Sequence, residues 1–435
     1  MKIIPTAEFP LGQIPPEDWM TAEATRAVIK ALESGGKEVR FVGGCVRDAL
    51  AHRPVDDIDI ATPERPENVM ELLRHAGIRV IPTGFDHGTV TVISDHRHYE
   101  ITTLREDIKT DGRHAEVVFG EDWLADARRR DFTINALSAT PDGAVYDPFN
   151  GIDDLAHGRV RFIGSPDQRV QEDALRILRF FRMYGRYGRP PADAAALASC
   201  RRFASLLKNL SAERIWMEFS KILLTDNPAD LVVLMTGANV MDELLAQDAG
   251  VGVLRMLAWL ETRALKLDGL APDVIRRLAS LLPCDAGAVD DVAACFRLSG
   301  RDRDRLYGFL IADDPGFLSM DDIGRARWFK HWGRDAFLAH VLLAWAKVLA
   351  LSPKLPHGEN AKWIDLVKFI LSWQSPVFPL SGNDVLALGV GAGPEVGALM
   401  ADVEKWWEDH NFTPVRQDCL AELKKRAQRI KDKTK

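Results

Sequence analysis

The pattern of apolar residues changes about a third of the way along this 435-residue chain, and this change restricts the possible fold more than any other feature. Up to about residue 150, helix-like and strand-like patterns alternate. Helices are expected at 22–33 and 66–75, and strands at 38–42, 57–61, 89–93 and 98–103, the last two forming a hairpin around Ser94-Asp95. From about residue 166 onward, Leu, Ala, Trp and Arg recur at helical spacing and strand patterns nearly vanish. The sequence therefore predicts an α+β protein with a mixed sheet followed by an all-helical remainder.

Composition excludes several classes of protein. The five cysteines are scattered and odd in number, which favours a reducing cytoplasm over a disulfide framework or a zinc site. The proline-rich start has no apolar signal core. The longest apolar stretch, 336–351, is interrupted by His340 and Lys347 and is shorter than the roughly 20 residues of a membrane span. It is interpreted as a buried helix, and no membrane partner is expected.

The positive charge is concentrated locally although the net charge is -7. Residues 159–190 contain eight arginines against three acids, and 424–435 are rich in lysine and arginine. For phosphate binding the distribution of charge matters more than its sum. Both segments are therefore candidate RNA contacts, although a solvated tail explains the C-terminal run at least as well.

The strongest local signal is Gly-Gly-Cys-Val-Arg-Asp at 43–48, followed by Asp-Ile-Asp-Ile-Ala-Thr at 57–62. Alternation along a strand places Asp57 and Asp59 on one face while Ile58 and Ile60 enter the core. Two rigidly held carboxylates suit Mg²⁺, which binds through a few carboxylates and substrate phosphates. Such ions activate an attacking hydroxyl and steady a leaving pyrophosphate. The arrangement predicts a metal site for nucleotidyl transfer.

The diglycine provides a turn at which the backbone can approach a phosphate closely. The helix that follows would direct its amide groups and Arg47 toward that anion. Taken alone, a Gly-Gly is usually a turn and an Asp-x-Asp usually a solvated edge strand. In this order and spacing, the functional interpretation is favoured.

A second segment, 128–137, begins with three arginines followed by Asp131 and an apolar, strand-like run. A basic run that leads into a buried strand can hold a triphosphate or ribose, whereas the alternative is a surface charge run.

A third segment, 172–182, has a helical stripe of Ala174, Ile177, Leu178 and Phe181. The opposite face is expected to carry one acid and three guanidiniums: Asp173, Arg176, Arg179 and Arg182. These side chains could form ordinary intrahelical pairs, each contributing about 0.2–0.5 kcal/mol, or they could hydrogen-bond the edge of a nucleobase.

Together the three segments resemble the class II tRNA nucleotidyltransferases, the CCA-adding enzymes, which share a polymerase β-like catalytic domain with bacterial poly(A) polymerases. Further matching motifs are Asp-Pro-Phe-Asn-Gly at 147–151 and Leu-Ser-Ala-Glu-Arg-Ile at 210–215. The resemblance runs from about residue 40 to about 224. It implies a catalytic head (1–160), a helical nucleotide-selecting neck (161–230), and a helical body and tail that bind tRNA (231–435). Where the family has a glycine pair, this chain has Asn150-Gly151, and Asn tolerates a left-handed backbone.

The resemblance also implies a role for each matching residue. Asp57 and Asp59 would be the catalytic Mg²⁺ ligands. The nucleotide would be contacted by Gly44, Arg47 and Arg130, with Asp131 near the ribose, Asp173 and Arg176 on the base edge, and Arg179 and Arg182 supporting the phosphates. Residues 105–114 would form a mobile element. Glu100 could be a third acid, although a strand-surface glutamate without such a role is favoured.

The implied activity is template-independent addition of CCA to the 3′ end of tRNA from CTP and ATP, with DNA not expected as a partner. A poly(A) polymerase is the main alternative, but such enzymes carry a basic segment where this chain has Gly-Phe-Asp-His-Gly-Thr-Val at 84–90. Partial CC-adding or A-adding activity stays open. An inactive RNA-binding module is disfavoured by the intact aspartates, and the C-terminal histidines lack the following aspartate that a fused phosphohydrolase would need.

Overall fold

The structure is a computed structural model that describes residues 9–85, 88–95, 97–110, 115–245, 250–311, 316–352, 354, 356–374 and 376–433, without the side chains of 106–110, 115–117 and 430–433. The chain divides into two compact units. The first comprises residues 1–251 and 291–298, and the second comprises 252–290 and 299–435. Within the described ranges, no helix is long and apolar enough to cross a membrane.

The first unit is built on an eight-stranded mixed sheet in the order β1-β10-β9-β2-β3-β6-β5-β4. The strands are β1 (Gly12–Gln13), β2 (Arg40–Val42), β3 (Ile58–Thr62), β4 (Arg79–Gly84), β5 (Thr89–Ser94), β6 (Arg97–Thr103), β9 (Ser138–Ala139) and β10 (Ala144–Tyr146). β3 and β6 run parallel, and the other neighbouring pairs are antiparallel. The predicted mixed sheet and the hairpin of β5 and β6 are confirmed.

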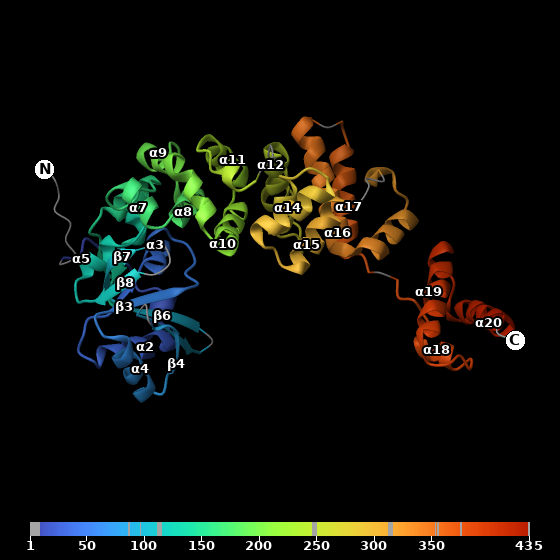
Figure 1. The fold of residues 1–435 in the computed structure, drawn as a ribbon, viewed down its shortest axis with the longest axis horizontal. Helices are drawn as coiled ribbons and strands as arrows, with labels where there is room; N and C mark the ends of the chain where they lie inside the picture. Colours follow the sequence, from blue (N-terminus) through green and yellow to red (C-terminus); the bar gives the residue numbers. More distant parts are fainter. Residues whose placement is uncertain are drawn as a thin grey trace. The chain divides into compact units, whose positions relative to one another are not determined.

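Two amphipathic helices, α2 (Glu23–Glu33) and α4 (Pro66–His75), pack together against one face of the sheet (Figure 1). α4 begins at Pro66, whose fixed φ suits the first helical position. Both helices bury one stripe, which includes Val28 and Leu32 of α2 and Leu73 of α4, in a core shared with β2, β3, β5 and β6. This core makes the sheet a rigid support for the side chains at its edge.

After β10 the described chain is helical, apart from an isolated bridge between Phe132 and Phe162. The helices assigned mainly to the first unit are α6 (Gly151–His157), α7 (Pro166–Glu172), α8 (Leu175–Tyr187), α9 (Ala194–Phe203), α10 (Ala212–Leu223) and α11 (Pro228–Gly237). Those that follow are α12 (Val251–Trp259), α13 (Val274–Ala279), α14 (Ala286–Phe296), α15 (Gly300–Leu310), α16 (Asp322–Leu351), α17 (Glu359–Ser372), α18 (Gly382–Leu386), α19 (Pro394–Asp409) and α20 (Arg416–Lys433). The predicted all-helical remainder is confirmed.

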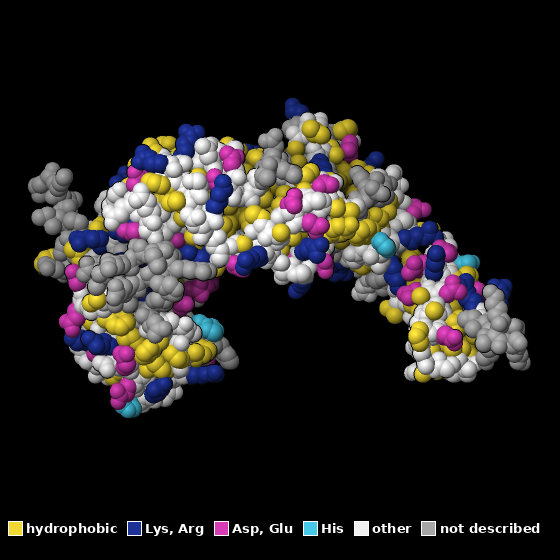
Figure 2. Space-filling view, viewed as in Figure 1, with side chains coloured by type: hydrophobic (Ala, Val, Ile, Leu, Met, Phe, Trp, Pro, Cys, Tyr) yellow, Lys and Arg dark blue, Asp and Glu magenta, His cyan; other side chains and the backbone are white. Residues whose placement is uncertain are grey.

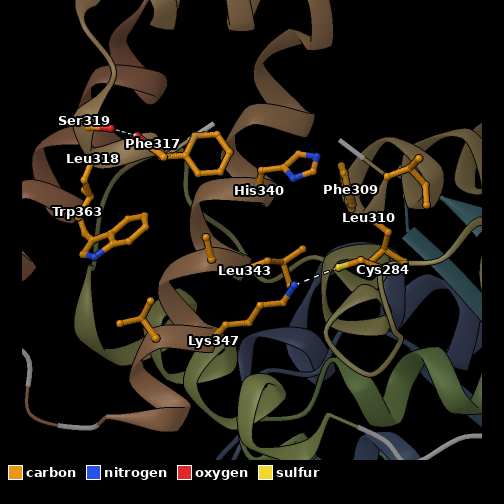
Figure 3. A pocket seen from close by; sticks show the side chains of 14 residues that line it. Cys284, Phe309, Leu310, Phe317, Leu318, Ser319, His340, Leu343, Lys347 and Trp363 are labelled. Carbon is orange, nitrogen blue, oxygen red and sulfur yellow. Dashed lines mark hydrogen bonds between the residues drawn. The ribbon is translucent and has the colours of Figure 1, made fainter. Parts of the chain in front are cut away.

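The second unit has its own apolar packing. The stretch 336–351 is the buried part of α16, which is kinked at Gly333 (φ 78°), so the predicted buried helix is confirmed. A cavity of about 630 Å³ in the second unit is lined by residues of α15, α16 and α17. Within it, the Lys347 ammonium donates a hydrogen bond to the Cys284 sulfur at 3.2 Å (Figure 3). None of the described residues that line this cavity is an Asp or Glu, so it offers no carboxylate ligand for Mg²⁺.

One predicted element is wrong. The apolar run 132–137 was expected to be strand-like, but after α5 (Trp123–Arg128) it forms a short 3₁₀ helix, η2 (Thr133–Asn135). Phe132, Ile134 and Leu137 are all buried, so apolar side chains of this run pack in more than one direction. The run therefore lacks the alternation of buried and exposed residues that marks a half-buried strand. A short apolar run of this kind cannot be assigned by periodicity alone.

Acidic and basic side chains are intermingled on the face of the protein that Figure 2 shows. The net charge of -7 is therefore not gathered into a single acidic face there, and local clusters decide which ligands are attracted.

Candidate active site

The diglycine turn is the point at which the predicted site residues meet. Gly43 (φ 67°, ψ -115°) caps the N-terminus of α3 (Gly44–Leu50). A Cβ on Gly43 would lie 2.9 Å from Arg130 Nη1 and 4.0 Å from Asp59 Oδ2, and a Cβ on Gly44 would lie 3.7 Å from Arg47 Nη2. Only a residue without a side chain leaves this space open beside the carboxylate and the guanidiniums.

The two aspartates share one side of β3. Ile58 and Ile60 are buried, whereas Asp59 is half-buried and Asp57, directly before the strand, is exposed. Burial is the largest influence on Asp59 and, with the nearby carboxylates of Glu100 and Asp57, raises its pKa to about 6 against the opposing effect of Arg130 and Arg47. Asp57 and Asp59 are therefore close enough for their charges to interact at a solvent-accessible part of the strand.

Glu100 lies beside this pair more closely than the sequence indicated. The parallel register of β3 and β6 sets Asp59 directly against Glu100, and Glu100 is exposed. The sequence interpretation favoured a glutamate without a role, but its charge is second only to burial among the influences on Asp59. Glu100 is therefore a neighbour of Asp59 in the sheet, and a role for it in the chemistry stays a prediction.

These acids fit a divalent cation by their chemistry. Burial and, after it, the negative charges of Glu100 and Asp57 raise the pKa of Asp59, and a bound cation would neutralise those charges. In the part of the chain that the structure describes, no three His, Cys, Asp or Glu side chains lie close enough together to hold a metal ion by themselves. Mg²⁺ needs no such cage, because it keeps water and uses substrate phosphates as ligands.

A buried network of polar side chains connects α3 to η2 and α8. Arg47 Nη1 donates to Asn135 Oδ1 at 2.5 Å, and Asn135 Nδ2 donates to Asp131 Oδ1 at 2.9 Å. Arg179 Nε then donates to Asp131 Oδ2 at 2.7 Å. Arg47 also pairs with Asp48 at 3.0 Å. The predicted residues Arg47, Asp131 and Arg179 thus belong to one network.

Asp131 is the centre of this network. Burial tends to raise its pKa, but Arg179, the Asn135 amide and the Phe132 backbone N–H outweigh burial and hold the pKa below its usual value. Asp131 is therefore an anion that fixes the Arg179 guanidinium in place. Its two oxygens already accept hydrogen bonds from protein groups.

Glu218 of α10 joins the two later arginines of α8. Its carboxylate accepts from Arg182 Nε at 2.5 Å and lies 3.9 Å from Arg179 Nη1. Glu218 is buried, so the pair is only partly screened by water. Arg179 and Arg182 are thus held by other elements and do not form the intrahelical pairs of the alternative interpretation.

Asp173 was expected on the same helix face as the three arginines, but the structure places it differently. Asp173 adopts an extended backbone (φ -153°, ψ 107°) between α7 and α8, so it does not lie on the helix with the arginines. Its carboxylate is paired with Arg214 of α10 at 2.9 Å. Arg176 is paired with Glu172 at 2.6 Å. Asp173 and Arg176 are neighbours in the fold, each fixed by a separate partner.

The sequence interpretation missed four members of this site: Asn135, Glu172, Arg214 and Glu218. Arg214 and Glu218 are four residues apart in α10, so they emerge on one helix face. Arg214 stands within the matching motif at 210–215, which was a signal that the resemblance left without a role.

Two smaller expectations concern loops. Asn150 has the left-handed backbone (φ 61°, ψ 36°) expected of a residue replacing glycine. Within the expected mobile element, Arg105–Thr110 forms β7, which pairs with β8 (Ala115–Phe119), while 111–114 lie outside the described residues. Its mobility stays a prediction.

Comparisons with known proteins identify the family to which the chain is similar. The family described as "Poly A polymerase head domain" matches residues 39–161, and the family described as "Probable RNA and SrmB-binding site of polymerase A" matches 193–247. The chain is 33% identical over 419 residues to human "CCA tRNA nucleotidyltransferase 1, mitochondrial", which covers 95% of this chain and 92% of the human protein. It is 41% identical over 201 residues to a "CCA-adding enzyme" of Streptococcus gordonii, covering 45% of this chain and 49% of that protein.

Solved structures show the same fold. A crystal structure of the Bacillus stearothermophilus CCA-adding enzyme in complex with CTP matches with a TM-score of 0.71 at 24% identity, over 95% of this chain and 99% of that chain. The Thermotoga maritima CCA-adding enzyme complexed with tRNA matches with a TM-score of 0.61 at 18% identity, over 95% of this chain and 98% of that chain. Similarity to the human protein along almost the whole chain shows that this chain belongs to the class II CCA tRNA nucleotidyltransferase and poly(A) polymerase family.

Proposed function

We propose that the protein adds C, C and A to the 3′ end of tRNA from CTP and ATP, without a nucleic-acid template, and releases pyrophosphate. The observation that carries the proposal is the position of Asp59 beside the diglycine turn, with the charges of Asp57 and Glu100 near it. The full-length relatives named as CCA tRNA nucleotidyltransferases support the choice of substrate. In this proposal the head spans 1–160, the neck 161–230, and the body and tail 231–435.

Asp57 and Asp59 would hold Mg²⁺, with Glu100 close enough to contribute negative charge. When bound, the metal would favour the ionised form of the attacking 3′ hydroxyl and neutralise charge on the leaving pyrophosphate. The family typically uses a divalent metal, and the choice of Mg²⁺ rests on the all-oxygen donor set.

The diglycine would let the triphosphate approach the backbone, at the N-terminus of α3. Arg130 borders the space above Gly43, so it is placed to contact the same phosphates. Arg47 would reach the nucleotide from behind the turn while its other contacts keep it rigid. Asp131 would act near the ribose and through Arg179, which with Arg182 supports the phosphates.

Asp173 and Arg176 would read the edge of the incoming base. A carboxylate accepts from an amino group and a guanidinium donates to ring nitrogens and carbonyls, so the pair can recognise the amino-bearing edges of cytosine and adenine. Arg214 and Glu172 hold the two side chains independently. A rigid pair discriminates better than a mobile one, because less order must be gained on binding.

Polyadenylation is the second candidate, because the matching head family is described by the name of poly(A) polymerase. The test is to offer the purified protein a tRNA that ends at its discriminator base, with each nucleotide alone and with all four. We expect products that stop after CCA. A long A tail would establish the alternative, and a halt after CC, or addition of A alone to tRNA ending in CC, would show a partial activity.

The cellular location stays a prediction. The scattered cysteines favour the cytoplasm, and the five are free in the structure. The human and mouse relatives are named as mitochondrial proteins.

Gly43→Ala is expected to lower kcat by at least about tenfold. The new methyl group would stand 2.9 Å from Arg130 Nη1 and displace a group placed on the triphosphate, and a 1 Å misplacement can cost about a hundredfold. Gly36→Ala is the matched control, because Gly36 has a similarly positive φ of 79° but no atom within 4 Å of the added Cβ. Gly36→Ala should keep near-normal kcat, and equal kcat losses in the two variants would contradict the role of the space above Gly43.

A further inference from the structure

A hollow with a positively charged lining lies beside the polar network of the first unit. It has a volume of about 330 Å³ and is formed by α8, the end of α10 and the segment after α3. Its charged lining consists of Arg53, Arg182, Arg186, Lys221 and Asp226. Four cations against one carboxylate on a concave surface favour an anion as the ligand.

Two of these cations are not neutralised by the protein. Arg182 is paired with Glu218, and Arg186 lies 3.7 Å from Asp48. Across the described residues, neither Arg53 nor Lys221 has a carboxylate within ion-pair distance. The hollow therefore carries uncompensated positive charge, which a phosphate group would neutralise.

The guanidiniums are held in position by Tyr187. Arg53 and Arg186 lie 5.0 Å and 5.6 Å from the centre of its ring, and Arg53 Nη2 donates to the Arg186 carbonyl at 2.7 Å. Arg47 of the nucleotide network lies over the same ring at 4.4 Å. Tyr187 is buried, so it is a fixed platform shared by the hollow and the candidate active site.

A second hollow adjoins the first and extends the positive surface. It has a volume of about 430 Å³, shares Arg53 and Arg186 with the first hollow, and adds Arg189. α3 has seven residues, so Arg53 is separated from the diglycine by a helix roughly 10 Å long. Two adjoining positively charged hollows, about one short helix away from the diglycine, can bind several phosphates in a row. They therefore suit a linear polyanion better than a single phosphate.

We infer that Arg53, Arg186, Arg189 and Lys221 form a phosphate track that binds consecutive backbone phosphates of the RNA strand whose 3′ end enters the active site. This inference rests on the proposed function. A positively charged groove that follows the backbone is the usual way in which proteins hold single-stranded nucleic acid. The track would guide the growing end while the nucleotide is read elsewhere.

The first test measures the affinity for a tRNA ending at its discriminator base, without nucleotides, over a range of salt concentrations. Lys221→Ala should weaken binding and reduce the slope of log affinity against log salt by about one, and Arg53→Ala with Lys221→Ala by about two. Lys30→Ala, an exposed lysine of α2, is the matched control and should leave the slope unchanged. Asp226→Asn should strengthen binding, because it removes from the hollow a negative charge that repels the RNA phosphates. Unchanged slopes in both track variants would overturn the inference.

The second test locates the bound phosphate. Single phosphates near the 3′ end of the tRNA are replaced by uncharged methylphosphonates, and one replacement should weaken binding to the wild type but not to Lys221→Ala. If the variants instead raise KM for CTP and ATP with unchanged RNA affinity, the hollow holds a triphosphate and the inference is wrong. Because binding is measured without incorporation, a wild type that binds tRNA but adds no nucleotide would refute the proposed function and leave the track intact.

Discussion

Asp59→Ala is expected to reduce nucleotide incorporation by at least about a thousandfold while tRNA binding stays close to that of the wild type. Stabilisation of transition-state charge by a metal contributes several kcal/mol, and each 1.36 kcal/mol corresponds to about a tenfold change in rate. Asp59 is half-buried next to Glu100 and the diglycine, so no neighbouring carboxylate can take its exact place. Single-turnover incorporation of radiolabelled CMP measures the loss.

Asp56→Ala is the matched control for this variant. Asp56 is an exposed carboxylate three residues before Asp59 and precedes the strand face that carries the pair. It should keep near-normal turnover. Asp57→Ala should resemble Asp59→Ala, because both residues act on one site. A double variant of Asp57 and Asp59 that still turned over near the wild-type rate would remove the metal assignment altogether.

Local sequence patterns were enough to predict these features of the catalytic head. Alternation along β3 separates the aspartates from Ile58 and Ile60, and this depends only on the two-residue period of a strand. Pro66 marks the first residue of α4, and Asn150 adopts the left-handed backbone expected of it. Each of these features is fixed by a residue and its immediate neighbours, which is why the sequence reveals it.

The pairings within the site could not be predicted in this way. Arg182 meets Glu218 across 36 residues, and Arg179 meets Asp131 across 48. Such contacts depend on how α8 packs against α10 and against the segment before η2. The neighbourhood of Glu100 and Asp59 likewise depends on β6 lying parallel to β3, whereas sequence order indicates only that β6 pairs with β5. Long-range packing also turned the apolar run at 132–137 into a 3₁₀ helix.

Arg176→Ala is expected to reduce the preference for CTP over UTP, and for ATP over GTP, by about ten- to a hundredfold. A bidentate contact to a base edge contributes about 1–3 kcal/mol of discrimination. The structure sharpens this prediction, because Arg176 is fixed by Glu172 while its neighbour Asp173 is fixed by Arg214. Loss of Arg176 should therefore remove one of the two side chains that contact the base and leave Asp173 held in place. Ratios of kcat/KM for the four nucleotides measure the effect.

Arg169→Ala separates base reading from anchoring. Arg169 pairs with the same Glu172 carboxylate at 2.7 Å, but its Nη2 donates to the Arg128 carbonyl at 2.5 Å, so it ties α7 to the head and is not part of the pair that contacts the base. It should lower thermal stability and leave the choice of nucleotide unchanged. Arg214→Ala should blur selection as Arg176→Ala does, because it frees Asp173 to move. If Arg169→Ala changed selection as much as Arg176→Ala, Glu172 and not Arg176 would be the group on which base choice depends.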